Sequence, residues 1–261
     1  MAEERFTLER RRWEEVGEEA LEKAGSHHGG VQGAALLLGG STAAGYADPY
    51  SSLDFYVIGR EVPTTASAWG RKGGQRYSYR LWNLGDFERR IHEMEDEALM
   101  VRLHGRILKD PGGELEAVWR RPVVIAPERW LTKAAQSYRH LRQRQASLAW
   151  SIRRGQPLTL LDNVLQVLSD GLAICLYLQG EPAPGRKWLM QAALRTPAGK
   201  RLRASVRSLF QALSQVDHLG GALQPRKNRL YQEVEALRGQ LAEELRAAGW
   251  DVPGKGGEED L

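Results

Sequence analysis

Cysteine, net charge and long apolar runs are all scarce in this sequence of 261 residues. With a single cysteine, Cys175, the chain can form neither an internal disulfide nor a thiolate metal site, so we expect a buried structural thiol. The formal net charge is only +4, which suits a small anionic ligand but is too weak to indicate a nucleic-acid partner. The apolar runs fall short of the ~18 residues of a membrane span.

The first residues, MAEERFTLERRRWEE, are charged from the start, unlike a secretory signal peptide. Together with the short apolar runs and the lone cysteine, this predicts a cytoplasmic protein that has no membrane partner.

The spacing of apolar residues changes near Arg121. Before it, strand-like and helix-like segments alternate. We predict strands over 31–38, 53–58, 76–82 and just after Gly105, helices over 6–24 and 84–97, and a Pro-, Thr-, Ser- and Gly-rich loop over 61–74. After Pro122 the period is helical throughout, over 128–154, 158–179, 187–194, 199–215 and 225–248.

The prediction is therefore an α+β fold with a small mixed-sheet domain over 1–121, an all-α helical bundle over 122–250 and a flexible tail over 251–261. One stripe of leucines at three- and four-residue steps should pack into the core of the bundle. Its members are Leu158, Leu161, Leu165, Leu168, Leu172 and Leu176.

The most informative segment is Leu36 to Gly59, LLLGGSTAAGYADPYSSLDFYVIG. An apolar strand runs into Gly39-Gly40-Ser41, a turn of small residues follows, and a second apolar strand carries one carboxylate, Asp54. Glycine lets the backbone approach a ligand closely, and backbone N–H groups with a serine hydroxyl can bond phosphate oxygens. The segment thus favours a phosphate site beside an acidic residue.

This segment resembles the signature of the nucleotidyltransferase superfamily, which has the polymerase-β-like fold. Gly40 and Ser41 match the family's Gly-Ser pair, and Gly45 matches the small residue after it. Asp48, Ser51 and Asp54 match its A-D-x-x-S-D-x-D spacing. A nucleotidyltransferase domain followed by a helical bundle is also the plan of antibiotic-modifying members of the family.

The resemblance implies that a nucleotide moves from ATP or another nucleoside triphosphate to a hydroxyl of a small-molecule acceptor, with Mg²⁺ as cofactor. It implies that Asp54 is catalytic and binds metal together with Asp48. It further implies that the nucleotide is bound by Gly39, Gly40, Ser41, Gly45, Ser51 and Ser52.

Two carboxylates of the family pattern are missing. Ser52 stands where the first metal-ligand aspartate is expected, and the third acid has only Ser78 or Arg80 as its nearest match. Each lost carboxylate removes a negative charge worth about 4 kcal/mol to a charge ~4 Å away at an effective dielectric of about 20. Such losses should weaken metal binding by orders of magnitude.

Three functions therefore stay open: an enzyme that transfers a nucleotide, a catalytically degenerate relative that binds a nucleotide or a partner without transfer, and a domain completed by another chain. A homodimer is also open. Trp69, Trp82 and Trp188 could stack on a base or an acceptor ring, but core packing is the expectation for all three.

Overall fold

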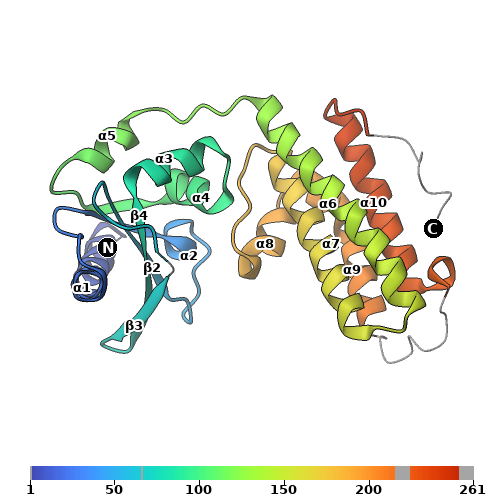
Figure 1. The fold of residues 1–261 in the computed structure, drawn as a ribbon, viewed down its shortest axis with the longest axis horizontal. Helices are drawn as coiled ribbons and strands as arrows, with labels where there is room; N and C mark the ends of the chain where they lie inside the picture. The colour runs from blue at the N-terminus through green and yellow to red at the C-terminus, as the bar shows by residue number, and fades with distance from the viewer. Residues whose placement is uncertain (1, 66, 215–223, 253–261) are drawn as a thin grey trace. The chain divides into compact units, whose positions relative to one another are not determined.

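The computed structural model of the chain describes residues 2–65, 67–214 and 224–252, so most of the predicted tail lies outside the described residues. The chain forms two compact units, Met1–Val124 and Ile125–Leu261. The first contains the sheet, and the second is helical (Figure 1).

Within the described residues, five strands form one sheet in the order β3-β4-β2-β1-β5. Their bounds are β1 Ala35–Gly39, β2 Leu53–Gly59, β3 Ala68–Lys72, β4 Gln75–Asn83 and β5 Arg106–Lys109. β2 and β4 run parallel, and the other neighbours are antiparallel. The sheet is mixed, which confirms the predicted α+β class.

Helices cover both faces of the sheet. The long helix α1 (Ala2–His28) packs on one face, where alternate strand residues such as Phe55, Tyr77 and Tyr79 are buried. The other face is covered by α3 (Leu84–His92), α4 (Asp96–His104) and α5 (Glu114–Arg120), over a core that includes Leu37 and Trp82. The four-residue α2 (Gly40–Ala43) follows β1 and contacts β2.

Four predicted elements in this unit differ from the observed ones. The strand predicted over 31–38 begins only at Ala35. The first helix does not end at Gly25 but continues to His28. The predicted loop 61–74 contains β3, an edge strand that pairs with β4 despite its weak apolar pattern. The predicted helix 84–97 is two helices, because Met94 takes a left-handed conformation with a φ of +63°.

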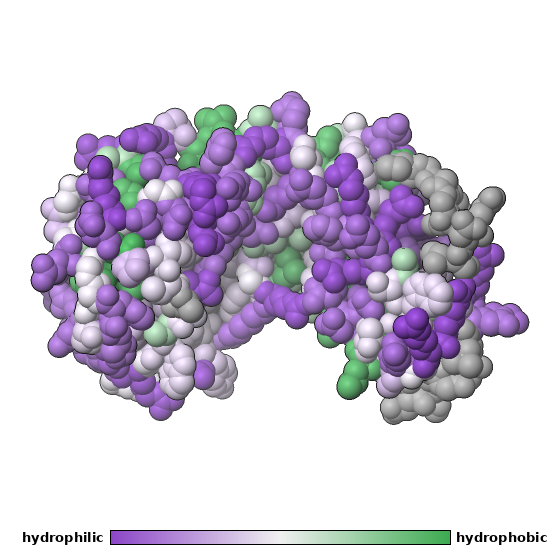
Figure 2. Space-filling model, in the orientation of Figure 1, coloured by the Kyte–Doolittle hydropathy of each residue, from purple (hydrophilic) through white to green (hydrophobic). Residues whose placement is uncertain are grey.

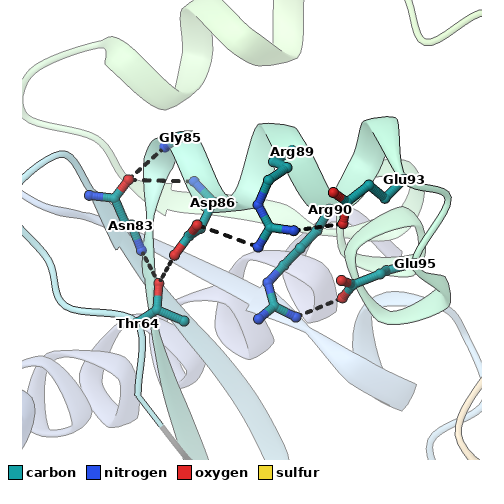
Figure 3. A network of polar contacts seen from close by, with 8 residues as sticks. All are labelled: Thr64, Asn83, Gly85, Asp86, Arg89, Arg90, Glu93 and Glu95. Carbon is teal, nitrogen blue, oxygen red and sulfur yellow. Dashed lines mark hydrogen bonds and ion pairs between the residues drawn. The ribbon is translucent and has the colours of Figure 1, made fainter.

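A polar network fixes the start of α3 (Figure 3). The side-chain oxygen of Asn83 accepts hydrogen bonds from the backbone N–H groups of Gly85 and Asp86, which caps the helix. The Thr64 hydroxyl donates to Asp86, and this bond is the main reason that the pKa of Asp86 is lowered. The loop before β3 is thereby held to the end of β4.

The second unit is built from α6 to α10. Their bounds are α6 Pro127–Arg153, α7 Pro157–Tyr177, α8 Arg186–Ala193, α9 Pro197–Leu213 and α10 Arg229–Ala247, with a short 3₁₀ turn at Pro225–Lys227. α6 and α7 make the most extensive helix–helix contact of the unit. Cys175 is fully buried on α7, as predicted, and burial raises the pKa of its thiol to about 12.

The predicted leucine stripe on α7 is partly wrong. Leu168, Leu172 and Leu176 are buried, but Leu158 and Leu165 are 80% and 44% exposed. The core side of the first half of the helix is instead formed by Leu160, Val164 and Val167.

By length and hydropathy α7 would pass as a membrane span, which the sequence prediction did not foresee, yet half of its most apolar stretch is buried within the fold. On the face that Figure 2 shows, hydrophilic residues predominate and apolar residues form small groups. This single helix is weak support for a membrane location, and a cytoplasmic location stays a prediction.

Candidate functional site

The two glycines at the end of β1 let β2 side chains lie directly against the backbone. Gly40 has a φ of +62°, and a Cβ there would lie 2.0 Å from Asp54 Oδ2 and 2.8 Å from Asp54 Cβ. A Cβ on Gly39 would lie 2.5 Å from the ring of Tyr56. Real Cβ atoms essentially never come this close, so both positions need glycine, and the Asp54 carboxylate is seated on Gly40.

Asp54 lies in a row of residues that crosses the sheet. It is opposite Gly39 on β1 and opposite Ser78 on β4. The Ser78 hydroxyl donates a hydrogen bond of 2.7 Å to Asp54 Oδ1, so both side chains are on the face away from α1. Ser78 rather than Arg80 is thus the residue beside Asp54, and Ser52 precedes Asp54 by two residues along the extended chain.

Asp48 and Ser51 close the loop before β2. Asp48 Oδ1 accepts hydrogen bonds from the Tyr50 backbone N–H at 3.0 Å and from the Ser51 hydroxyl at 2.8 Å. Ser51 Oγ also accepts from the Asp48 N–H. This is an Asx-type turn, and it occupies the Asp48 carboxylate with local contacts. Gly45 lies earlier in the same connection, with a φ of +76° and open space around it.

The described residues do not fit a two-metal centre. No group of three His, Cys, Asp or Glu side chains among them could hold a metal ion. Serines, Ser52 and Ser78, stand at the two positions beside Asp54 where further acids were expected, and Asp54 Oδ1 accepts a hydrogen bond from Ser78. The Asp48 carboxylate is occupied by hydrogen bonds within its own turn. Mg²⁺ needs oxygen ligands, usually carboxylates completed by substrate phosphates, and here one carboxylate is available. The assignment of Asp54 and Asp48 as metal ligands stays a prediction.

Two arginines on β3 and β4 lie on the same face as Asp54, in the row next to the one that contains Asp54 and Ser78. Arg71 and Arg76 are directly opposite each other across the strand pair, two residues from Trp69 and Ser78. Like charges in this arrangement destabilise a sheet. Among the side chains that the structure describes, no ion pair neutralises either arginine, although Arg76 donates to the Tyr50 carbonyl at 3.2 Å. An anion would offset the repulsion.

On the other side of the row lies a cluster that the sequence reasoning missed. Tyr56 donates a hydrogen bond of 2.8 Å to Glu97 Oε1, and Arg80 pairs with the same oxygen. Burial, followed by the charge of Glu97, raises the pKa of Tyr56 well above its usual value. Alternation along β2 and β4 could have placed Tyr56 and Arg80 beside Asp54 and Ser78, but Glu97 comes from α4 and carries no local signal.

Together this face carries three arginines, Arg71, Arg76 and Arg80, against two carboxylates, Asp54 and Glu97. The balance is slightly cationic beside the partly exposed segment Gly40 to Gly45, in which a turn follows the short helix α2, and the backbone N–H groups and hydroxyls of this segment can meet an anion.

Comparisons with known proteins leave the family open. No protein-family model matches the sequence, and a search of curated proteins finds no match. The chain is similar to the crystal structure of a nucleotidyltransferase-like protein from Exiguobacterium sibiricum, with 16% identity and a TM-score of 0.44, over 87% of this chain and 71% of that one. Values this low assign neither a fold family nor an activity to the chain.

Proposed function

We propose that the unit 1–124 is a nucleotidyltransferase-like domain that binds a nucleoside triphosphate without a two-metal centre. The triphosphate lies along the segment Gly40–Gly45, which comprises α2 and the turn after it, and there backbone N–H groups and the Ser41 hydroxyl contact phosphate oxygens. Arg71 and Arg76 supply charge complementarity from the neighbouring strands.

A single observation carries this proposal. Asp54, the carboxylate in the row with Gly39 and Ser78, is packed on Gly40 and accepts a hydrogen bond from Ser78, while the next row of the sheet presents an arginine pair instead of further acids. A site that must hold divalent cations gathers negative charge, and a site that must hold phosphates directly gathers positive charge. The second description fits this face better.

Transfer of the nucleotide to a hydroxyl of a small acceptor is the second candidate. It is favoured by the position of Asp54, which lies against Gly40 where the resemblance expects a metal ligand. Transfer would need at least one more acid at the site, from a second copy of the chain or another partner. Binding without transfer needs no such addition, and we therefore place it first.

A pair of glycine variants tests where the nucleotide binds. Gly40→Ala forces Asp54 from its place and should weaken ATP binding at least tenfold, because the loop and the carboxylate must both shift. Gly113→Ala has a similar positive φ, +66°, meets no atom within 4 Å and lies outside the segment Gly40–Gly45, so it serves as the matched control for backbone strain. We expect the control to cost about 1–2 kcal/mol of stability and to leave ATP affinity within about threefold of the wild type.

Isothermal titration calorimetry with ATP, on folded protein verified by circular dichroism, gives both affinities. Equal ATP affinities for Gly40→Ala and the wild type would contradict a site at this loop. A comparable loss of ATP affinity in Gly113→Ala would show that general backbone strain, and not the contact between Gly40 and Asp54, controls binding.

A further inference from the structure

Trp69 is 83% exposed, more than any other tryptophan that the structure describes, and it lies on the edge strand β3. The sequence led us to expect core packing, which is wrong for this residue. Trp82, by contrast, is 3% exposed and belongs to the core. Singly exposed apolar residues are common on protein surfaces, so exposure by itself assigns no role to Trp69.

The strand register shows which residues lie in the same row as Trp69. Trp69 is directly opposite Ser78, which is opposite Asp54, which is opposite Gly39. Directly opposed residues share a face of the sheet, so Trp69 continues the row that contains the candidate site. At about 4.8 Å per strand, the Trp69 backbone is roughly 10 Å from that of Asp54.

The neighbours of Trp69 confirm which face it occupies. Ala68 packs against the core beneath α1, and Gly70 is opposite Tyr77, whose ring is buried on the α1 side. Side chains alternate along a strand, so Trp69 leaves β3 on the opposite face, together with Arg71.

We propose that Trp69 is a stacking platform for the base of the bound nucleotide. The inference rests on the proposed function and deepens it, by assigning the phosphates and the base to separate parts of one sheet face. Phosphates extend from the segment Gly40–Gly45 toward Arg76 on β4 and Arg71 on β3, and the heteroaromatic ring stacks on the indole at the sheet edge. Stacking on an aromatic side chain tolerates any base, because every base has a π-face.

Trp69 suits this role because of what surrounds it. The indole is 83% exposed, so most of its surface is available to a ligand, while its strand neighbour Gly70 packs against Tyr77 on the opposite face. The neighbouring arginine pair favours an anionic occupant over an apolar protein segment. A nucleoside triphosphate combines the planar ring and the negative charge that this surface complements.

The test compares ATP with inorganic tripolyphosphate, which has the phosphates but no base. Calorimetric titrations use the full chain as wild type, Trp69→Ala and Trp69→Phe. Trp150→Ala is the matched control, since Trp150 is also exposed, at 48%, but belongs to the helical unit. Stacking contributes about 1–3 kcal/mol per base in alanine substitutions, so Trp69→Ala should weaken ATP binding about 5- to 150-fold.

Tripolyphosphate affinity should stay within about threefold in every variant, and Trp69→Phe should retain most of the ATP affinity, because a phenyl ring still stacks. Equal ATP affinities of Trp69→Ala and the wild type would overturn the stacking role while leaving the phosphate site intact. The stacking role would also be overturned if Trp69→Ala lost equal affinity for ATP and tripolyphosphate, or if it lost a dimer contact while its ATP affinity stayed unchanged. If the wild type bound neither ligand, the proposed function and the stacking role would fall together.

Discussion

The role of Asp54 decides whether the site binds phosphates directly or through a metal ion. Its carboxylate is seated on Gly40 and accepts a hydrogen bond from Ser78, so its position is fixed by neutral groups. A metal ligand and a structural carboxylate can occupy the same position, but they respond to loss of charge in opposite ways.

Replacing the charge of Asp54 separates the two roles. Asp54→Asn keeps the size of the side chain and an oxygen that can accept from Ser78. If phosphates bind directly, the variant loses a repulsion of about 1 kcal/mol for charges ~4 Å apart in a water-like dielectric, and ATP should bind about fivefold tighter in EDTA. Calorimetry at low salt measures the change, with Asp48→Asn as the control carboxylate outside the strand row. If Asp54→Asn instead bound ATP more weakly than the wild type in excess Mg²⁺, Asp54 would be a metal ligand.

Residue chemistry explains what the sequence could reveal about the site. Gly40, Ser41 and Asp54 are close in sequence and joined by one antiparallel pair, so their proximity follows from local spacing. Glu97 and Trp69 reach the same face only through the packing of α4 and the pairing of β3, and neither belongs to a local motif. Non-local partners of this kind cannot be read from one sequence.

Among the elements, β3 and α7 depart most from expectation, for related reasons. β3 is an edge strand with glycine and two basic residues, so its composition resembles a loop and its pairing with β4 decides its structure. On α7 leucines occur on several sides, and the neighbours α6, α8 and α10 determine which of them are buried. In the helical unit, the predicted ranges of α6, α8 and α9 agree with the observed ones within two residues, and the range predicted for α10 begins four residues too early.

The pairing of α6 and α7 includes a charge that is poorly solvated. Asp170 on α7 accepts a hydrogen bond of 3.0 Å from Arg144 on α6, and its side chain is 19% exposed. Burial raises the pKa of Asp170, and the arginine only partly opposes this effect. In the folded state Asp170 therefore keeps its proton to a higher pH than in the unfolded state. The contribution of Asp170 to stability falls as pH rises from its unfolded-state pKa to its folded-state pKa.

Asp170→Asn should remove this pH dependence. As pH rises from about 4 to about 7, the free energy of unfolding of the wild type should fall relative to that of the variant. Urea denaturation at several pH values measures the difference. Asp162→Asn on the same helix is the control at an exposed position. The difference in free energy of unfolding between this variant and the wild type should not change with pH. If the wild type instead gained stability relative to Asp170→Asn as pH rises, the charge of Arg144 would affect the pKa of Asp170 more than burial does.

At the scale of the whole molecule, the site residues all belong to one of the two units. The chain divides after Val124, three residues beyond the change of pattern at Arg121 in the sequence. The named loop, strand and arginine residues lie in the first unit, so nucleotide binding in this proposal does not depend on the helical unit. The helical unit remains free to serve an acceptor or a partner, which is still a prediction.

The central claim is that this chain binds a nucleoside triphosphate directly rather than through a metal centre. Calorimetry of ATP with the wild-type chain, in EDTA and then in excess Mg²⁺, tests it most directly. We predict that the affinity in EDTA is within about threefold of that in Mg²⁺ or tighter, since free ATP carries more negative charge for Arg71 and Arg76. Ser52→Asp, which restores the missing acid, should make binding depend on Mg²⁺. Wild-type binding that disappears in EDTA, or no ATP binding in either condition, would contradict the claim.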